Sequence, residues 1–158
     1  MISLIVAVDP NFGIGLNDTL PWHIKEDLKL FKETTLNQTI VMGEKTFFGL
    51  PKPLPNRKTI VVSLDPDCHA EHEDVTVCHD LIGLLEEYKK TDKNLFICGG
   101  ATIYRLSLPY ADKLCISFVK ESYNVDTYFP PVCWEDFTLS YEEDKGPFVY
   151  REFVRKGA

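Results

Sequence analysis

Residues 95–104 read Leu-Phe-Ile-Cys-Gly-Gly-Ala-Thr-Ile-Tyr, an apolar run of strand length that enters two glycines and continues as a helical pattern. The same order of strand and helix repeats outward along the chain. Strand patterns occupy residues 2–8, 39–42, 59–62, 75–78, 95–98, 114–119, 137–141 and 148–154, and helical patterns occupy about 24–35, 44–48, 81–90 and 102–108. This alternation predicts an α/β fold in a single domain: a mostly parallel, eight-stranded twisted sheet with a C-terminal antiparallel hairpin, flanked by about four helices.

Composition and charge narrow the class of protein. The chain has 158 residues, and 17 basic against 24 acidic side chains give a net charge of −7. Its 44% apolar content suffices for one packed core and excludes intrinsic disorder. The acidic balance argues against nucleic-acid or membrane partners. No signal peptide or transmembrane run is evident, and five singly scattered cysteines are typical of a reducing compartment. We therefore expect a cytoplasmic monomer.

One acidic side chain lies on the apolar side of the first helix. At roughly 100° per residue, Asp27 falls between Phe31 and Leu30, whereas the other charged side chains of 24–35 share the opposite arc. A lone buried carboxylate is unfavourable unless it is paired or protonated. Asp27 therefore either caps a neighbouring loop or meets a buried partner, or it faces a ligand with a raised pKa.

The segment 9–23, between the first strand and the first helix, is rich in turn-forming residues. Connections of about 15 residues are uncommon inside compact domains and often act as lids. Gly13 and Gly15 do not complete a GxGxxG fingerprint, because residue 18 is Asp. The segment is either a plain flexible loop or a lid whose apolar Ile14 and Trp22 cover something.

Two strand-to-helix turns could hold phosphate. Gly99 and Gly100 would let the backbone approach a ligand, and the helix that follows offers free N–H groups. Gly43 precedes a second such turn, in which Thr46 could bind amides or a phosphate. Each feature alone is equally compatible with a tight turn that binds nothing.

The stretch 50–58 is rigid through its prolines and carries three cations. It is either a surface turn or a clamp that presents Arg57 to an organic carboxylate, for which a guanidinium is suited. Other chemistries can be set aside, because the sequence holds no GxSxG, P-loop or HExxH motif. His69 and His72 lie in a polar loop, so we expect no metal site there.

Several short motifs follow one another along the chain. They are Leu-Pro-Trp at 20–22, Asp27 with Leu28 and Phe31, Met-Gly at 42–43, Lys-Thr at 45–46, Leu-Pro-Asn-Arg at 54–57, Gly-Gly at 99–100, Tyr104, and Asp-Thr-Tyr-Phe-Pro at 126–130. In this order and spacing the chain resembles dihydrofolate reductase of the bacterial chromosomal type over nearly its whole length. The resemblance implies reduction of 7,8-dihydrofolate to tetrahydrofolate for one-carbon metabolism, with hydride passing from NADPH to C6 of the pterin and a proton reaching N5. It also implies binding of antifolate inhibitors.

The resemblance also implies roles at the pterin. Asp27 would bind the 2-amino group and N3 with support from Ser117, and Trp22 would hold a water; with Leu20 and Tyr104 these form the expected catalytic set. Arg57 would grip the glutamate α-carboxylate. The expected substrate-binding set is Ile5, Ala7, Asp27, Leu28, Phe31, Leu50, Lys52, Leu54, Arg57, Cys98 and Ser117.

On the cofactor side, the resemblance implies that the lid over residues 9–23 closes on the nicotinamide and that the Gly99–Gly100 peptide is cis. The expected cofactor-binding residues are Ala7, Gly13, Ile14, Gly15, Leu16, Asn17, Asp18, Thr19, Leu20, Gly43, Lys45, Thr46, Ser63, Leu64, His79, Cys98, Gly99, Gly100, Ala101, Thr102, Ile103 and Tyr104.

Two residues depart from the pattern of the family. Glu44 stands where relatives usually have an Arg that meets the 2′-phosphate, and neutral Thr102 stands where some have an Arg beside the pyrophosphate. Either Lys45 with Ser63 replaces the first contact, or discrimination between NADPH and NADH is weakened. We predict a modest preference for NADPH.

Two other hypotheses about function compete with dihydrofolate reduction. The same scaffold could reduce another pteridine or a riboflavin-pathway substrate, or it could bind a nucleotide or folate without catalysis. Asp27 and Arg57 favour the folate reading. Loss of NADPH absorbance on addition of dihydrofolate would separate an enzyme from a silent binding module.

Overall fold

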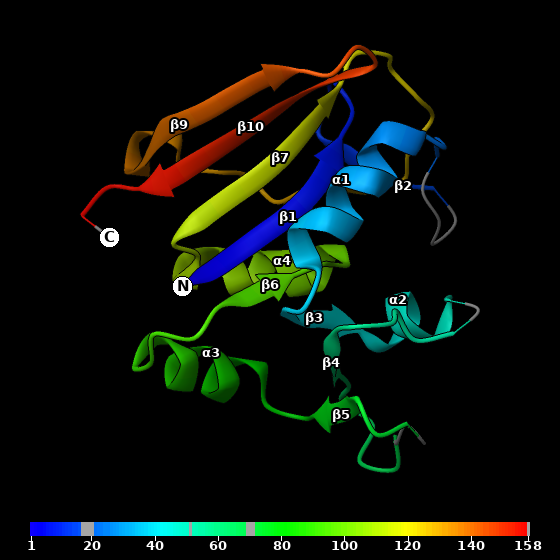
Figure 1. Cartoon of the computed structure of the whole chain (residues 1–158), viewed down its shortest axis with the longest axis vertical. Coiled ribbons are helices and arrows are strands. Elements are labelled where there is room, and N and C mark those ends of the chain that lie inside the picture. The colour runs from blue at the N-terminus through cyan, green and yellow to red at the C-terminus, as the bar shows by residue number, and fades with distance from the viewer. Residues whose placement is uncertain (17–20, 51, 69–71, 158) are drawn as a thin grey trace.

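An eight-stranded sheet forms the centre of the computed structural model (Figure 1), which describes residues 1–16, 21–50, 52–68 and 72–157. The strands are β1 (Ile2–Val8), β3 (Thr39–Gly43), β4 (Lys58–Val62), β5 (Val75–Cys78), β6 (Leu95–Ile97), β7 (Lys113–Val119), β9 (Phe137–Asp144) and β10 (Phe148–Arg155). Their order is β5-β4-β3-β6-β1-β7-β10-β9. The first six in that order pair in parallel, and β10 pairs antiparallel with both β7 and β9. The predicted mostly parallel sheet with a C-terminal hairpin is thus confirmed.

Strand β1 shows why the continuous apolar runs form central strands. It lies between β6 and β7, and both of its faces are covered. Its even-numbered residues, such as Leu4 and Val8, pack in one core cluster, whereas Ile5 packs in another on the opposite face. Parallel strands buried on both faces need apolar side chains at nearly every position, which is the pattern of the sequence.

Four helices cover the two faces of the sheet. They are α1 (Lys25–Thr35), α2 (Glu44–Phe48), α3 (Leu81–Lys89) and α4 (Ala101–Ser107), all within a few residues of the predicted bounds. Leu85 of α3 and Ile103 of α4 join the cluster that contains Leu4. Phe31 of α1 packs with Ile5, and Phe47 of α2 packs with Met42 on the same side. No helix in the described ranges is both long and apolar enough to cross a membrane.

A small second sheet connects the segment 9–23, expected to be a flexible loop or a lid, with residues 127–128. Strands β2 (Gly13–Gly15) and β8 (Thr127–Tyr128) pair antiparallel. The carboxylate of Asp9, only 1% exposed, accepts hydrogen bonds from the backbone N–H groups of Asn11, Gly13 and Tyr123, and so joins the two segments. Such short strands fall below what residue alternation can detect. Two 3-10 turns, Leu108–Tyr110 and Trp134–Asp136, were also not predicted.

Candidate active site

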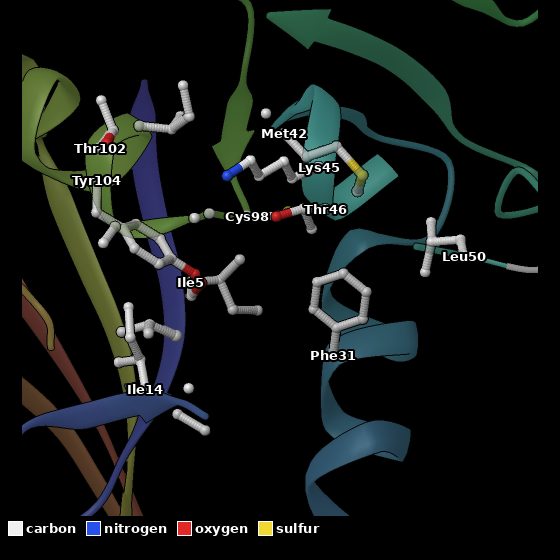
Figure 2. A pocket seen from close by; sticks show the side chains of 18 of the residues that line it. Ile5, Ile14, Phe31, Met42, Lys45, Thr46, Leu50, Cys98, Thr102 and Tyr104 are labelled. Carbon is white, nitrogen blue, oxygen red and sulfur yellow. Dashed lines mark hydrogen bonds between the residues drawn. The ribbon is translucent and has the colours of Figure 1, made fainter. Parts of the chain in front are cut away.

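A cavity of about 800 Å³ is lined by residues of α1 and by residues at the carboxyl ends of the parallel strands. This is where open α/β sheets bind ligands. Figure 2 shows Phe31 and Leu50 on one side of it and Tyr104 and Ile14 on the other. Expected site residues that line the cavity are Ile5, Ala7, Ile14, Gly15, Asp27, Leu28, Phe31, Gly43, Lys45, Thr46, Leu50, Leu54, Ser63, Leu64, Cys98, Gly99, Gly100, Ala101, Thr102, Ile103, Tyr104 and Ser117.

Asp27 lies on the half-buried face of α1, as the helical periodicity predicted. Burial raises the pKa of its carboxyl, and a hydrogen bond from the hydroxyl of Ser117 partly opposes that rise. Ser117, on β7, is 4% exposed. Asp27 therefore meets a buried partner, one of the sequence-based alternatives, and it also lines the cavity.

Trp22 lies just before α1 and is buried. Its ring packs at 5.3 Å from that of Tyr123. The indole Nε1–H has no hydrogen-bond partner among the described residues. A buried N–H of this kind usually binds ordered water.

The turns after β3 and β6 meet at the middle of the cavity. The Gly99–Gly100 peptide is cis, as the resemblance implied, and Gly43 N–H donates to the Gly99 carbonyl at 2.9 Å. A Cβ added at Gly43 would lie 3.3 Å from Ile103, and one at Gly100 would lie 3.7 Å from the Thr46 hydroxyl. A side chain at Gly43 would therefore be tight against Ile103, whereas one at Gly100 would make only an ordinary contact. Because these positions carry no side chains, the backbone of the junction lines the cavity directly.

Tyr104 forms the wall between the glycines and β1. Its hydroxyl donates to the Ile5 carbonyl at 2.7 Å, and burial raises its pKa well above the usual value. Cys98 lies beside it at the end of β6, where burial also raises the pKa of the thiol. Both groups therefore stay neutral near pH 7. Cys98 is thus unsuited to act as a nucleophile.

Arg57 is 7% exposed and is fixed by three hydrogen bonds. Its guanidinium donates to the Thr35 hydroxyl at 3.1 Å and to the carbonyls of Pro55 and Lys32. These contacts tie the turn before β4 to the end of α1. A guanidinium has five N–H donors, so two remain for a further acceptor.

The described residues contain no group of three or more His, Cys, Asp and Glu side chains that could hold a metal ion.

Comparison with known proteins decides the family. The family model for dihydrofolate reductase matches residues 1–148. The chain is 38% identical to dihydrofolate reductase of Bacillus subtilis, over 98% of this chain and 92% of that protein. The chain belongs to the dihydrofolate reductase family. It is also 38% identical to the type 3 dihydrofolate reductase of Salmonella typhimurium, over 98% and 96% of the two chains. A solved dihydrofolate reductase from Enterococcus faecalis, complexed with NADP(H) and RAB-propyl, has a TM-score of 0.87 and 34% identity, and the match covers 99% of this chain and 96% of that one.

Not every residue expected from the dihydrofolate reductase pattern lines the cavity. Gly13, Leu16, Trp22, Lys52, Arg57 and His79 lie outside its lining. Asn17, Asp18, Thr19 and Leu20 fall outside the described residues. His79 instead contacts the Ser63 carbonyl through Nδ1 at 2.9 Å.

Some lining residues were missed by the sequence analysis. They include Val6, Leu30, Met42, Val62, Asp65, Thr127 and Tyr150. Asp65 could have been found, because it directly follows Ser63 and Leu64 at the end of a predicted strand. Tyr150 could not, because only the antiparallel pairing that places it opposite Ser117 brings it to the cavity.

Proposed function

We propose that this chain reduces 7,8-dihydrofolate to 5,6,7,8-tetrahydrofolate with NADPH, by hydride transfer to C6 of the pterin and protonation of N5. The observation that carries the proposal is Asp27. A half-buried carboxylate, supported by Ser117, lines one cavity together with the apolar Phe31 and Leu54 and the Gly99–Gly100 turn. A flat, polar heterocycle with an apolar tail fits such a cavity.

The residues around the two glycines fit a dinucleotide. Gly43, Gly99 and Gly100 have no side chains of their own, so their backbone lines the cavity directly, and Lys45 and Thr46 lie beside it (Figure 2). These residues would hold the pyrophosphate, and Ala7, Ile14 and Tyr104 would surround the nicotinamide. NADPH, when bound, supplies the hydride.

The protein's own contribution to the reaction is to orient the pterin and to favour its protonation. Ionised Asp27 would accept hydrogen bonds from the 2-amino group and N3. The negative charge of Asp27 would favour the protonated pterin beside it. Trp22 would bind the water nearest the ring through its unpaired N–H. The carbonyls of Ile5 and Cys98 would line the far side of the ring.

The remainder of the substrate would extend along α1 towards Arg57. Leu28, Phe31, Leu50 and Leu54 line that part of the cavity and would sandwich the p-aminobenzoyl group. The two remaining N–H groups of Arg57 would bind the α-carboxylate, with Lys52 nearby. Leu20 and the neighbouring residues 17–19 would complete a lid that excludes water from the nicotinamide.

The wider role follows from the reaction. Tetrahydrofolate would supply one-carbon metabolism, including thymidylate and purine synthesis, and antifolates would bind beside Asp27. We expect the chain to act as a single-domain cytoplasmic monomer. Light scattering of the purified protein tests the oligomeric state.

The proposed function is tested by oxidation of NADPH that depends on dihydrofolate. Wild-type protein should oxidise one NADPH for each tetrahydrofolate formed. Asp27→Asn should lose several orders of magnitude in turnover near pH 7, because neutral Asn cannot offset the positive charge of a protonated pterin. Its affinity for NADPH should be unchanged. Unchanged turnover in this variant would contradict the role of Asp27.

A further inference from the structure

The rim of the cavity at the carboxyl ends of β3 and β4 carries a polar cluster centred on Ser63, which is 3% exposed. The Ser63 hydroxyl donates a hydrogen bond to Oε2 of Glu44, the first residue of α2. It also accepts one from the backbone N–H of Asp65 at 3.1 Å. His79 Nδ1 contacts the Ser63 carbonyl at 2.9 Å, which fixes the same turn from the other side. The Glu44 carboxylate is therefore held in one orientation by a buried hydroxyl.

The charges at this rim are unfavourable for a dianion. Glu44 and Asp65 both line the cavity there, and the neighbouring cation among the described lining residues is Lys45. The other lining cation, Lys32, lies on α1. The Ser63 hydroxyl, which could otherwise have donated a hydrogen bond to a phosphate oxygen, donates one to Glu44. A dianionic phosphate placed here would meet the Glu44 carboxylate and the Lys45 ammonium, with the exposed Asp65 nearby, whose carboxylate accepts a hydrogen bond from the Asp67 N–H.

The adenosine end of the cofactor reaches this rim, an inference that rests on the proposed function. With the nicotinamide beside Ile14 and Tyr104 and the pyrophosphate at Gly99–Gly100, the extended dinucleotide continues past Thr46. The cavity wall in that direction is made by Glu44, Ser63, Leu64 and Asp65. The adenosine ribose and its 2′ substituent would therefore lie next to Glu44.

We propose that Glu44, held by Ser63, accepts a hydrogen bond from the ribose 2′-hydroxyl of NADH, so that the protein prefers NADPH to NADH only modestly. An acidic side chain that binds the 2′-hydroxyl is how many dinucleotide-binding proteins select NAD, whereas an arginine accommodates the 2′-phosphate. A carboxylate has about four lone-pair sites, and Ser63 fills one of them. Lys45 supplies the residual attraction for NADPH.

Fragments of the two cofactors test this without catalysis. Calorimetry should give Kd values for 2′,5′-ADP and 5′-ADP that differ by less than about thirtyfold in wild-type protein. Glu44→Gln removes the charge and keeps the shape, so it should tighten 2′,5′-ADP about tenfold and change 5′-ADP much less. Glu44→Arg should favour 2′,5′-ADP further. The control is Glu87→Arg, on the exposed side of α3 and outside the cavity lining. It changes the net charge of the chain as much as Glu44→Arg does and should leave the ratio of the two Kd values unchanged.

The same comparison with NADPH and NADH, by binding and by kcat/KM, completes the test. A wild-type preference for the phosphorylated compound of thirtyfold or more overturns the inference, as does a ratio that does not rise in Glu44→Gln. If neither NADPH nor NADH binds, both the proposed function and the inference about Glu44 are wrong. If NADPH binds with a large preference, only the role of Glu44 fails.

Discussion

Replacement of Arg57 by lysine tests whether substrate binding needs the hydrogen-bonding geometry of the guanidinium or only its positive charge. Three of the five guanidinium N–H groups are used by Thr35, Pro55 and Lys32, which leaves two for the α-carboxylate of dihydrofolate. Lysine keeps the positive charge but lacks the planar fork. Loss of two charge-assisted hydrogen bonds of about 1.5 kcal/mol each amounts to about 3 kcal/mol, or roughly a hundredfold in substrate Kd.

The assay compares two substrates. One is 7,8-dihydrofolate, and the other is a 7,8-dihydropterin that lacks the p-aminobenzoylglutamate tail. Arg57→Lys should reduce kcat/KM for dihydrofolate by roughly a hundredfold and leave that for the short pterin within a fewfold. Arg105→Lys, on the exposed side of α4, makes the same chemical change away from the cavity lining and should affect neither.

Two results would refute this reasoning. Equal losses with both substrates would mean that Arg57 acts only by holding the turn before β4 against α1. Unchanged activity with dihydrofolate would mean that its remaining N–H groups do not meet the carboxylate. Thermal unfolding of the variant shows whether the lost structural hydrogen bonds also lower stability.

Three further outcomes follow from the described contacts. Ser117→Ala removes a hydrogen bond that favours ionised Asp27, so the pKa of Asp27 should rise further and the alkaline limb of the pH–rate profile should move to higher pH; an unmoved limb would contradict this. The pKa of Asp27 in the folded protein is raised above its ordinary value of 3.8, so the folded state holds this proton more tightly than the unfolded state does. The free energy of unfolding therefore falls as the pH rises from about 4 through the folded pKa. Asp27→Asn should therefore melt above wild type at about pH 8, with a gap that closes towards about pH 4; a gap independent of pH would argue against it. Gly13→Ala should destabilise the β2–β8 pairing by about 1–3 kcal/mol, because the added Cβ would lie 2.5 Å from Val125; denaturant unfolding measures this, and a neutral result would refute it.

Much of the fold follows from local patterns. Runs such as residues 2–8 are long and apolar enough to form central strands, and the periodicity of α1 placed Asp27 on the half-buried side. The β2–β8 pair was missed, because two or three residues carry too little pattern to identify a strand. It depends instead on Asp9, whose buried carboxylate bonds to Tyr123, more than a hundred positions away.

Some features of the candidate site could likewise be predicted from local sequence, and others could not. Glycines at 99–100 could be identified as a turn that admits a ligand, because their lack of side chains is a local property. The pairing of Glu44 with Ser63 could not be foreseen, because it depends on the parallel register that sets Gly43 beside Val62. The three hydrogen bonds of Arg57 likewise join segments that only the packed fold brings together.

We propose that this protein transfers hydride from NADPH to C6 of dihydrofolate. The most direct measurement uses NADPH deuterated at both positions of the nicotinamide C4, followed by mass spectrometry and NMR of the folate product. We predict that the tetrahydrofolate formed carries one deuterium, located at C6. A protein that binds both compounds but forms no tetrahydrofolate, or a product without deuterium at C6, would contradict it.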